Sequence, residues 1–402
     1  MLGSVRILDL TWVLGGPFAG QLLAQLGAEV IKIEGPGGDL SRAVPPHFFE
    51  GDSAFYLSVN RGKRGIAIDL KHPDGLATFY DLVRNADAVV YGFAPDVPKR
   101  LGIDFETLSR INPKIVVAEL IGLHDEGDYA RAPAYDLIVQ ALGGIMSITG
   151  EAGGAPARVG YQIGDLAAGL YLALAVAGGL VKSAREGKGS RVQISLLDCQ
   201  IALLTWHAQN FLISGEVPSA IGSRNAVLAP SEVYRCADGR YLAVSPTGDH
   251  FWRKFCAMIG RPDFVDDPRY ATRAARIQNV DSLSAALGDI FARKTAKEWT
   301  DEFFAERIPA ASVLSVEEAL TQPVSQLRGM VEEAIKPESG NPMKFVGNPF
   351  KYPERQPLSY PPSYGTQTNA VLREVCGYGN DKIQSLIGNK AIFEGASSDK
   401  TV

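Results

Sequence analysis

Cysteine is scarce in this chain of 402 residues, and the few cysteines are scattered. No CxxC pair or other metal-ligand spacing occurs among Cys199, Cys236, Cys256 and Cys376. We therefore expect no bound metal and a reduced, cytoplasmic setting. The histidines form no HExxH pattern, and no GxSxG sequence marks a serine nucleophile. These absences leave metal-dependent and serine hydrolase chemistry without support.

Strong charge of one sign is also missing. The chain has 40 basic and 45 acidic residues and a formal net charge of −5. It therefore offers no polycation for nucleic acid or for an anionic membrane, and we expect neither as a partner. Any anionic ligand must instead meet a local basic site.

Hydrophobic runs long enough to cross a membrane are missing as well. The longest apolar run, 166–181, has about 16 residues, short of the roughly 20 that a spanning helix needs. Small residues dominate this run, which favours a closely packed buried helix. The N-terminus lacks a basic start followed by a long apolar stretch, so it is better explained as a first strand than as a signal peptide.

Apolar β-rich runs alternate with helical patterns in the first half of the chain. With 46% hydrophobic residues, the chain can bury a large core and form two or three domains at roughly 100–200 residues each. The alternation predicts a doubly wound, mostly parallel, Rossmann-like α/β sheet. Strands are expected at 5–10, 30–33, 65–70, 88–91, 115–120 and 191–195, and helices at 20–26, 75–85, 105–111, 166–181 and 196–213.

The pattern changes after about Gly215. Short strands and amphipathic helices there predict a second, smaller α+β domain. Its strands are expected at 232–234 and 241–245, and its helices at 250–259, 280–291 and 296–306. The predicted domains are 1–214 as the first part of a large domain, 215–330 as the small domain, and 331–402 as a segment that returns to the large domain. Within this last segment, 337–364 should be a long ordered connection, and 395–402 should fray.

A glycine-rich sequence, 15–20, follows the first predicted strand, and Glu34 ends the second. This arrangement superficially suggests a dinucleotide site, but the glycine spacing is not GxGxxG, which disfavours NAD. Pro17 suits the first turn of a helix. The glycines either permit tight packing or expose backbone N–H groups to a phosphate of another nucleotide.

Basic residues are spread through the first domain, and several follow predicted strands, where open α/β sheets place ligands. Any one of them alone is best explained as solvated surface. Together they would suit a ligand with several phosphates. The set comprises Arg42, Arg61, Lys63, Arg64, Lys71, Lys99, Arg100 and Arg131.

Asp165 stands just before the apolar run of small residues. An aspartate at a helix start is commonly an N-cap. A carboxylate at the positive end of a helix also stays ionised, and an ionised carboxylate can act as a nucleophile. The two roles are compatible.

Several ordered motifs together resemble the class III CoA-transferase family, which includes formyl-CoA:oxalate and carnitine CoA-transferases. The resemblance spans nearly the whole chain. It rests on VRILDLTWVLGGPFAGQLLAQLGAEVIKIE, NRGKRGIAIDLKHPDG, RAPAYDLIVQALGG, YQIGDLAAGLYLALAVAGGL, GKGSRVQISLLD and EWTDEFFAERIPAASVLSVEEAL.

The resemblance implies a covalent mechanism in which Asp165 is the nucleophile. The CoA thioester is then a substrate, and no permanently bound cofactor is expected. It also implies an interlocked homodimer with the active site between large and small domains. CoA contacts are implied for Val13, Lys71, Phe93 and Arg100, phosphate or substrate contacts for Arg42 and Arg131, and a place near the active site for Asp136.

Two departures from the family pattern bear on the substrates. The formyl-CoA enzymes carry a tetraglycine run where this chain has residues 222–226, GSRNA, which argues against formate or oxalate. Gly92 replaces an Asn found beside Phe93 in some relatives. We expect C4 or C5 dicarboxylic acids such as succinate, malate, mesaconate or itaconate, because Arg42 or Arg224 could hold a second carboxylate. The same residues would also fit an intramolecular mesaconyl-CoA C1–C4 transfer. Alternatively, these arginines bind only CoA phosphate or solvent, because arginine is often exposed.

The main alternative is an α-methylacyl-CoA racemase, an isomerase that resembles the same family. The histidine base of those relatives lies in a GHD-like motif, which here is Ala134-Tyr135-Asp136. A tyrosine, with an ordinary pKa of about 10, suits a base at neutral pH poorly. A non-catalytic CoA-binding protein is disfavoured because Asp165 is present.

Overall fold

The structure is a computed structural model that describes residues 1–395, except for the side chain of Arg131. Residues 396–402, most of the tail expected to fray, lie outside the described part. The chain divides into two compact units. Unit 1 comprises Met1–Ile145, Val159–Gly215 and Leu327–Val402, and unit 2 comprises Met146–Arg158 and Glu216–Gln326.

The segment Met146–Arg158 is where these units depart from the predicted domain boundaries. The sequence assigned it to the large domain, whereas the structure groups it with unit 2. The Gly222 N–H donates a hydrogen bond to the Gly150 carbonyl (2.8 Å), which ties the segment to chain beyond Gly215. A pairing between two distant loops has no local periodicity, so the sequence pattern does not reveal it.

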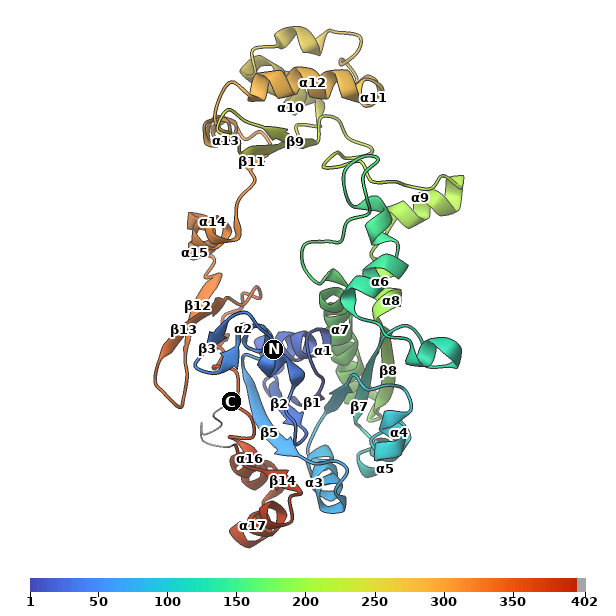
Figure 1. Cartoon of the computed structure of the whole chain (residues 1–402), viewed down its shortest axis with the longest axis vertical. Helices are drawn as coiled ribbons and strands as arrows, with labels where there is room; N and C mark the ends of the chain where they lie inside the picture. Colours follow the sequence, from blue (N-terminus) through green and yellow to red (C-terminus); the bar gives the residue numbers. More distant parts are fainter. Residues whose placement is uncertain (396–402) are drawn as a thin grey trace. The chain divides into compact units, whose positions relative to one another are not determined.

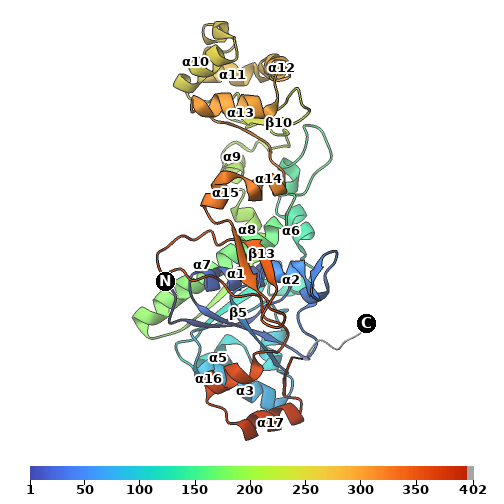
Figure 2. The same cartoon turned by 90° about the vertical axis from the view of Figure 1, so that its left-hand side faces the viewer.

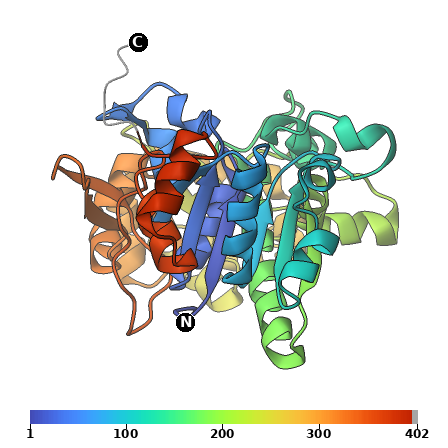
Figure 3. The same cartoon turned by 90° about the horizontal axis from the view of Figure 1, so that it is seen from below.

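Unit 1 is built on a seven-stranded sheet with the strand order β14-β5-β2-β1-β6-β7-β8. All pairings are parallel except that of β14 with β5, so the predicted large, mostly parallel sheet is confirmed. Helices cover both faces of the sheet (Figure 3). The strands are β1 (Arg6–Leu10), β2 (Glu29–Glu34), β5 (Lys63–Ile68), β6 (Ala88–Tyr91), β7 (Val116–Ile121), β8 (Ser190–Ser195) and β14 (Ile392–Phe393).

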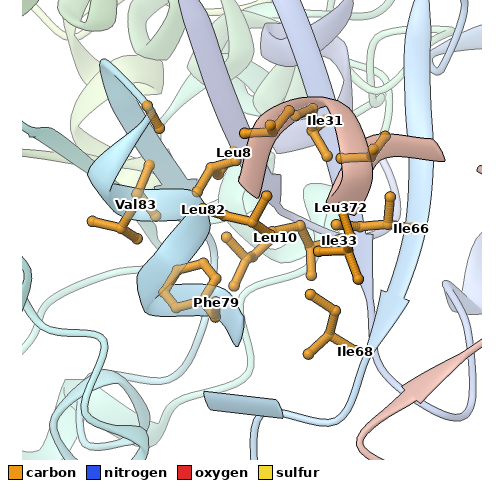
Figure 4. Close-up of a cluster of buried hydrophobic side chains, with 14 of the residues drawn as sticks. Leu8, Leu10, Ile31, Ile33, Ile66, Ile68, Phe79, Leu82, Val83 and Leu372 are labelled. Atoms are coloured by element: carbon orange, nitrogen blue, oxygen red, sulfur yellow. The ribbon is translucent and has the colours of Figure 1, made fainter. Parts of the chain in front are cut away.

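Alternate residues of the central strands point to opposite faces of the sheet, and each face has its own core. On one face, aliphatic side chains of β1, β2 and β5 pack against α3 (Pro73–Arg84) and α16 (Thr368–Cys376) (Figure 4). This core includes Leu8, Leu10, Ile31, Ile33, Ile66, Ile68, Phe79, Leu82, Val83 and Leu372. On the other face, Ile7, Val30 and Val116 pack with residues of α1 (Gly15–Gln25) and α7 (Ile163–Glu186).

The helices α1 and α7 lie side by side (Figure 1) and meet at two glycines. A Cβ atom at Gly169 would lie 2.5 Å from the Gly15 carbonyl oxygen, and one at Gly15 would lie 2.8 Å from the Asp165 carbonyl oxygen. Glycine is therefore required for this close approach. The helix α1 begins at Gly15, five residues before the predicted start, because the glycine-rich sequence forms its first turn instead of a loop.

By length and composition alone, α7 is long and apolar enough to cross a membrane, a test that core helices of soluble proteins also pass. In its most apolar 18-residue stretch, 44% of the residues are buried. Its buried side comprises mainly small residues, which include Ala167, Ala168 and Ala173. This burial agrees with the packed helix expected from the sequence.

Two segments of unit 1 differ from their predicted form. The helix expected at 196–213 is broken into α8 (Leu196–Ala202) and α9 (Trp206–Ser214) at Thr205, whose φ is 43°. The connection expected at 337–364 contains a strand, β13 (Pro342–Val346), which pairs with β12 (Val331–Ile335). Phe345 and Tyr360 pack with Tyr56, so the return segment is anchored on the first part of the chain.

The remaining elements of unit 1 are short, apart from α17. They are β3 (Phe48–Phe49), β4 (Asp52–Ser53), α2 (Ala54–Ser58), α4 (Val97–Leu101), α5 (Phe105–Ile111), α6 (Asp136–Leu142) and α17 (Asn380–Gly388). A short helix, α15 (Pro323–Leu327), ends at Leu327, the residue at which the chain returns to unit 1.

Unit 2 is an α+β unit with a three-stranded antiparallel sheet, in the order β11-β10-β9. Aromatic residues such as Trp252, Phe291 and Trp299 form its core, and α10, α12 and α13 gather beside the sheet (Figure 2). The elements are β9 (Glu232–Arg235), β10 (Tyr241–Val244), α10 (Asp249–Met258), α11 (Arg273–Gln278), α12 (Val280–Phe291), α13 (Ala296–Ala305), β11 (Ala310–Ser312) and α14 (Val316–Thr321).

The contact between α1 and α7 predicts opposite effects for two glycine substitutions in the same helix. Gly169→Ala should lower the free energy of unfolding by about 1–3 kcal/mol, because its methyl group would overlap the Gly15 carbonyl. Gly178→Ala has open space around it and should raise stability by about 0.5–1 kcal/mol. Urea unfolding of both variants measures the difference. A Gly169→Ala protein as stable as Gly178→Ala would show that the helices do not need this close approach.

Candidate active site

Two cavities lie at the edge of the unit 1 sheet where the parallel strands end. β1 pairs with β2 on one side and with β6 on the other, so the strand order reverses between β1 and β6, where open α/β sheets bind ligands. The smaller cavity has a volume of about 320 Å³ and the larger about 1010 Å³. Trp12 and Phe93 line both cavities, and their rings pack edge to face with centroids 6.2 Å apart.

Asp165 lines the smaller cavity from the first turn of α7. Facing chain segments from the ends of β1, β6 and β7 complete the cavity, and include Thr11–Gly16, Gly92–Pro95 and Leu120–His124. Among the described residues, the Asp165 carboxylate accepts no hydrogen bond. The sequence allowed a capping role for Asp165, but the structure shows no such bond: the N-cap residue is Gln162, which makes no capping bond either.

The surroundings of Asp165 disfavour its charged form. Burial raises the pKa of Asp165 from its ordinary 3.8 to about 6, and the nearby carboxylate of Asp136 contributes to the increase. Such a carboxyl group is still mostly ionised at neutral pH. An ionised carboxylate with no hydrogen-bonding partners keeps its lone pairs available for nucleophilic attack.

Asp136 lies at the start of α6 and is only 8% exposed. Its Oδ1 accepts a hydrogen bond from the Gly164 N–H (2.9 Å), and its Oδ2 accepts one from the Gln140 side-chain amide (2.8 Å). Asp136 therefore satisfies a backbone donor at the start of α7, directly before Asp165. The structure brings the two predicted acidic residues together in this way.

The N-terminus of α1 lies against the backbone of Asp165. Gly15 and Gly16 line the same cavity as Asp165. Their N–H groups have no hydrogen-bonding partner among the described residues, as expected for the first turn of a helix, and Pro17 has no N–H. Two backbone donors are thus available in the cavity that Asp165 lines, where they could stabilise a developing negative charge.

The larger cavity contains three of the residues for which CoA contacts were predicted. Lys71, Phe93 and Arg100 line it together, as does His72. Val13 lines the smaller cavity and has a left-handed backbone, with φ of 66°. The structure thus brings the four predicted CoA contacts to two neighbouring cavities.

Several other predicted residues lie elsewhere. Arg42 lines neither cavity and donates hydrogen bonds to Glu34, Tyr56 and the Pro362 carbonyl, which gives it a structural role; its ligand contact stays a prediction. The side chain of Arg131 lies outside the described residues. Arg224 belongs to unit 2, where it lines a cavity of about 920 Å³ and pairs with Glu232 and Asp281.

Two members of the predicted basic set are buried, which corrects the idea that all of them suit a phosphate ligand. Arg61 and Lys63 are each 2% exposed and pair with Glu332 and Asp9. The sequence missed Trp12, Tyr129 and other cavity residues. Trp12 could have been predicted from its position shortly after β1, because open α/β sheets bind ligands where their parallel strands end.

The raised pKa predicts a pH-dependent stability difference for Asp165→Asn. Folding raises the pKa of Asp165 from 3.8 to about 6, so ionised Asp165 costs up to about 3 kcal/mol of stability above pH 6. This cost decreases as the pH falls through 6 and vanishes below 3.8, where both states are protonated. We expect the variant to exceed wild type in urea midpoint at about pH 7.5 and to approach it near pH 4. An equal gain at both pH values would contradict the raised pKa.

Comparisons with known proteins identify the family. A model of CoA-transferase family III matches residues 2–368. The chain is 35% identical to succinate–glutarate CoA-transferase of Agrobacterium fabrum (strain C58) over 384 residues, 93% of this chain and 95% of that protein. It is 36% identical to acetyl-CoA:oxalate CoA-transferase of Acetobacter aceti over 375 residues, 92% of this chain and 95% of that protein. The solved structure of a CAIB/BAIF family protein from Brucella suis matches with a TM-score of 0.82 and 30% identity, covering 93% of this chain and 99% of that one. The chain therefore belongs to CoA-transferase family III and is a CoA-transferase.

Proposed function

We propose that the protein moves CoA between carboxylic acids through covalent intermediates on Asp165. The observation that carries this proposal is the place of Asp165 itself. Asp165 lines a cavity at the carboxyl edge of the sheet together with Gly15 and Gly16, whose N–H groups are free, and its carboxylate has no hydrogen-bonding partner among the described residues. A nucleophile and donors for an oxyanion are the parts that acyl transfer requires.

The proposed reaction begins when the Asp165 carboxylate attacks the thioester carbonyl of the donor. The carbon–sulfur bond breaks, CoA leaves as a thiolate, and an acyl-aspartyl anhydride forms. The thiolate then attacks the aspartyl carbonyl and displaces the donor acid as its carboxylate, which leaves an aspartyl-CoA thioester. The acceptor carboxylate repeats the two steps in reverse order, so the product acyl-CoA and the free Asp165 carboxylate are released.

Each step passes through a tetrahedral oxyanion, which needs hydrogen-bond donors fixed in position. The N–H groups of Gly15 and Gly16 are the candidates, because they line the cavity and are left free by the helix. Water would hydrolyse the anhydride and the thioester, so the closed part of the cavity must exclude it.

CoA is proposed to occupy the larger cavity, with its thioester end passing Trp12 and Phe93 into the smaller one. Both aromatic residues line both cavities, so they mark the passage between them. Lys71 and Arg100 supply positive charge for phosphate groups in an otherwise largely apolar cavity.

C4 and C5 dicarboxylic acids are the proposed substrates. The name of one relative contains succinate and glutarate, which are C4 and C5 dicarboxylates, whereas the other relative is named for oxalate, a C2 acid. Arg42 and Arg224 stay the predicted candidates for the distal carboxylate. A panel of acyl-CoA donors against free dicarboxylic acids, with oxalate and mesaconyl-CoA included, identifies the acids and separates transfer between molecules from transfer within one molecule.

The racemase alternative gains no support from the site. Tyr135 occupies the position of the expected histidine, lines the Asp165 cavity and is 78% exposed. His124 also lines this cavity, but its Nδ1 accepts a hydrogen bond from the Glu126 N–H (2.9 Å). It is not the residue before Asp136, where the racemases have their histidine base.

A second copy of the chain is proposed to complete the molecule as an interlocked homodimer in the cytoplasm. Apolar side chains are exposed on three helices of unit 1, α6, α7 and α9, and large exposed apolar surfaces mark interfaces. They include Leu137, Leu142, Leu170, Leu174, Phe211, Leu212 and Ile213.

Trapping of the covalent intermediate tests the proposed mechanism. Incubation with succinyl-CoA followed by borohydride should modify Asp165 in the wild-type protein, because the aspartyl-CoA thioester is reducible. Asp165→Ala should lose transfer while it still binds succinyl-CoA, since the side chain supplies chemistry and little binding area. Peptide mass spectrometry locates the modification. Turnover in Asp165→Ala, or labelling at Cys199, would relocate the nucleophile.

Two matched substitutions test the roles of the basic residues. Arg224→Met should raise KM for succinyl-CoA and leave KM for the monocarboxylic butyryl-CoA unchanged, because only the former has a distal carboxylate. Lys71→Met should raise KM for both thioesters by a similar factor, as expected for a contact to CoA itself. Steady-state kinetics with the two thioesters separates the effects. Equal losses for both in Arg224→Met would refute the distal-carboxylate role.

A further inference from the structure

Four charged side chains are buried next to the segment Thr11–Gly16, which lines the Asp165 cavity. Asp9, Lys32, Lys63 and Asp39 are each at most 5% exposed. The first three come from β1, β2 and β5, and Asp39 follows β2. Burying charges costs several kcal/mol each, and well-packed apolar side chains often serve stability as well. Their presence therefore calls for a role other than stability alone.

One pair, Lys63 and Asp9, holds both ends of the segment. The Lys63 Nζ donates hydrogen bonds to Asp9 Oδ2, to the Pro17 carbonyl and to Asn60 Oδ1, each at 2.8 Å. Asp9 Oδ1 accepts the Thr11 N–H (2.9 Å) and the Thr11 hydroxyl. Burial alone would raise the pKa of Asp9, but the charges of Lys63 and Lys32 outweigh it and lower the pKa.

The other pair, Lys32 and Asp39, holds the middle of the segment. The Lys32 Nζ donates to the Thr11 carbonyl (2.9 Å) and to Asp39 Oδ2 (2.7 Å). Asp39 Oδ1 accepts the Val13 N–H (3.2 Å). Burial alone would raise the pKa of Asp39, but the charge of Lys32 and the hydrogen bonds from Lys32 and Ser41 lower this pKa to about 2. Asp39 is therefore ionised at every pH at which the enzyme works.

The bonds from Lys32 and Asp39 hold the backbone directly before a strained residue, Val13. Val13 has φ of 66°, a left-handed conformation that costs a β-branched residue energy. Such a conformation persists only when the surrounding structure holds it. One residue further on, after Leu14, come Gly15 and Gly16, whose N–H groups are free and which line the same cavity as Asp165.

We propose that the buried Lys32–Asp39 pair is a positioning device for the reaction, which fixes the Thr11–Val13 turn so that the N–H groups of Gly15 and Gly16 meet the oxyanion formed at Asp165. This inference rests on the proposed covalent mechanism. Oxyanion donors must be held within about 0.5 Å of their productive place, and side chains supported by hydrogen bonds achieve this better than a free loop. Lys32 and Asp39 contact no substrate themselves; they act through the backbone.

The double variant Lys32→Met/Asp39→Asn tests the inference. It removes both charges together, so that neither is left buried without its partner, and the new amide oxygen at position 39 can still accept the Ser41 and Val13 N–H groups. The rate of aspartyl-CoA formation with saturating succinyl-CoA, followed by rapid quench and intact mass, should fall about 10–100-fold. The dissociation constant for succinyl-CoA should stay within about threefold, because the lost contacts act mainly in the transition state.

A second double variant serves as rescue. Lys32→Gln/Asp39→Asn keeps a neutral donor that can reach the Thr11 carbonyl, so it should recover part of the rate at similar stability. If the Met variant does not fold, Lys32→Leu/Asp39→Asn, which also lacks the donor to the Thr11 carbonyl, takes its place: a rate equal to wild type would overturn the inference, whereas recovery in the Gln variant supports it.

A matched pair elsewhere in unit 1 gives the control. Lys336 Nζ donates to Asp52 Oδ2 at 2.9 Å, and both side chains are largely buried, but neither touches Thr11–Gly16. Lys336→Met/Asp52→Asn should change the rate of adduct formation less than about threefold even if its melting temperature falls.

The possible outcomes separate this inference from the proposed mechanism. If wild type forms the adduct and the Lys32 variants form it equally fast, the inference is wrong and the mechanism stands. If the control pair loses as much rate as the Lys32 pair, the effect is general destabilisation and the inference is again wrong. If wild type forms no adduct, the proposed mechanism fails and the inference fails with it.

Discussion

The close approach of α1 and α7 is the constraint on which the active site depends. Glycines at positions 15 and 169 let the two helix backbones touch, and this contact carries the start of α1 to the backbone of Asp165. Neither helix needs a hydrogen bond to the Asp165 side chain for its position. Because helix packing and the bond from the Gly164 N–H to Asp136 fix the backbone of the acid, the carboxylate of Asp165 remains free of partners among the described residues, and the donors at the start of α1 remain free as well.

Three buried or half-buried carboxylates near the same edge of the sheet have opposite electrostatic surroundings. Asp9 and Asp39 each bond to a buried lysine, which lowers their pKa. Asp165 has another carboxylate near it instead of a cation, and burial raises its pKa to about 6. The lysines favour the charged form of Asp9 and Asp39, and both carboxylates accept hydrogen bonds from the backbone. The burial of Asp165 reduces stability, and it leaves a carboxylate of the kind that the proposed covalent transfer requires.

The sequence predicted the parts of unit 1 that depend on local pattern. Buried β-rich runs separated by helical patterns predicted strands within two residues of those observed, and a parallel order follows from that alternation. Asp165 was singled out by its place before a run of small residues and by the resemblance to a family, and it lines a cavity. The resemblance also implied Lys71, Phe93 and Arg100, which the structure places at one cavity; their roles stay predictions.

Features set by contacts between distant residues could not be predicted in the same way. Lys32 and Lys63 look like ordinary surface residues in the sequence, and only the strand register places them beside carboxylates in the interior. The glycines at 15 and 16 looked like a loop, because helix propensity counts against glycine whereas tertiary packing requires it here. The contacts of Arg42 include the carbonyl of Pro362, 320 positions away, which no local pattern can indicate.

The distance along the chain between partners in the large sheet also bears on synthesis. β5 gains its last neighbour, β14, only when residues 392 and 393 are present, and the Ala67 N–H bonds to the Thr368 side chain, 301 positions further on. Most of unit 2, 216–326, is one continuous stretch. On the ribosome, unit 2 can therefore complete its core while β5 still has an open edge, and such an edge is a site for wrong pairing with other chains. A chain released before residues 392 and 393 are made would lack β14, so the edge of β5 would stay open. A strand made late therefore protects one made early.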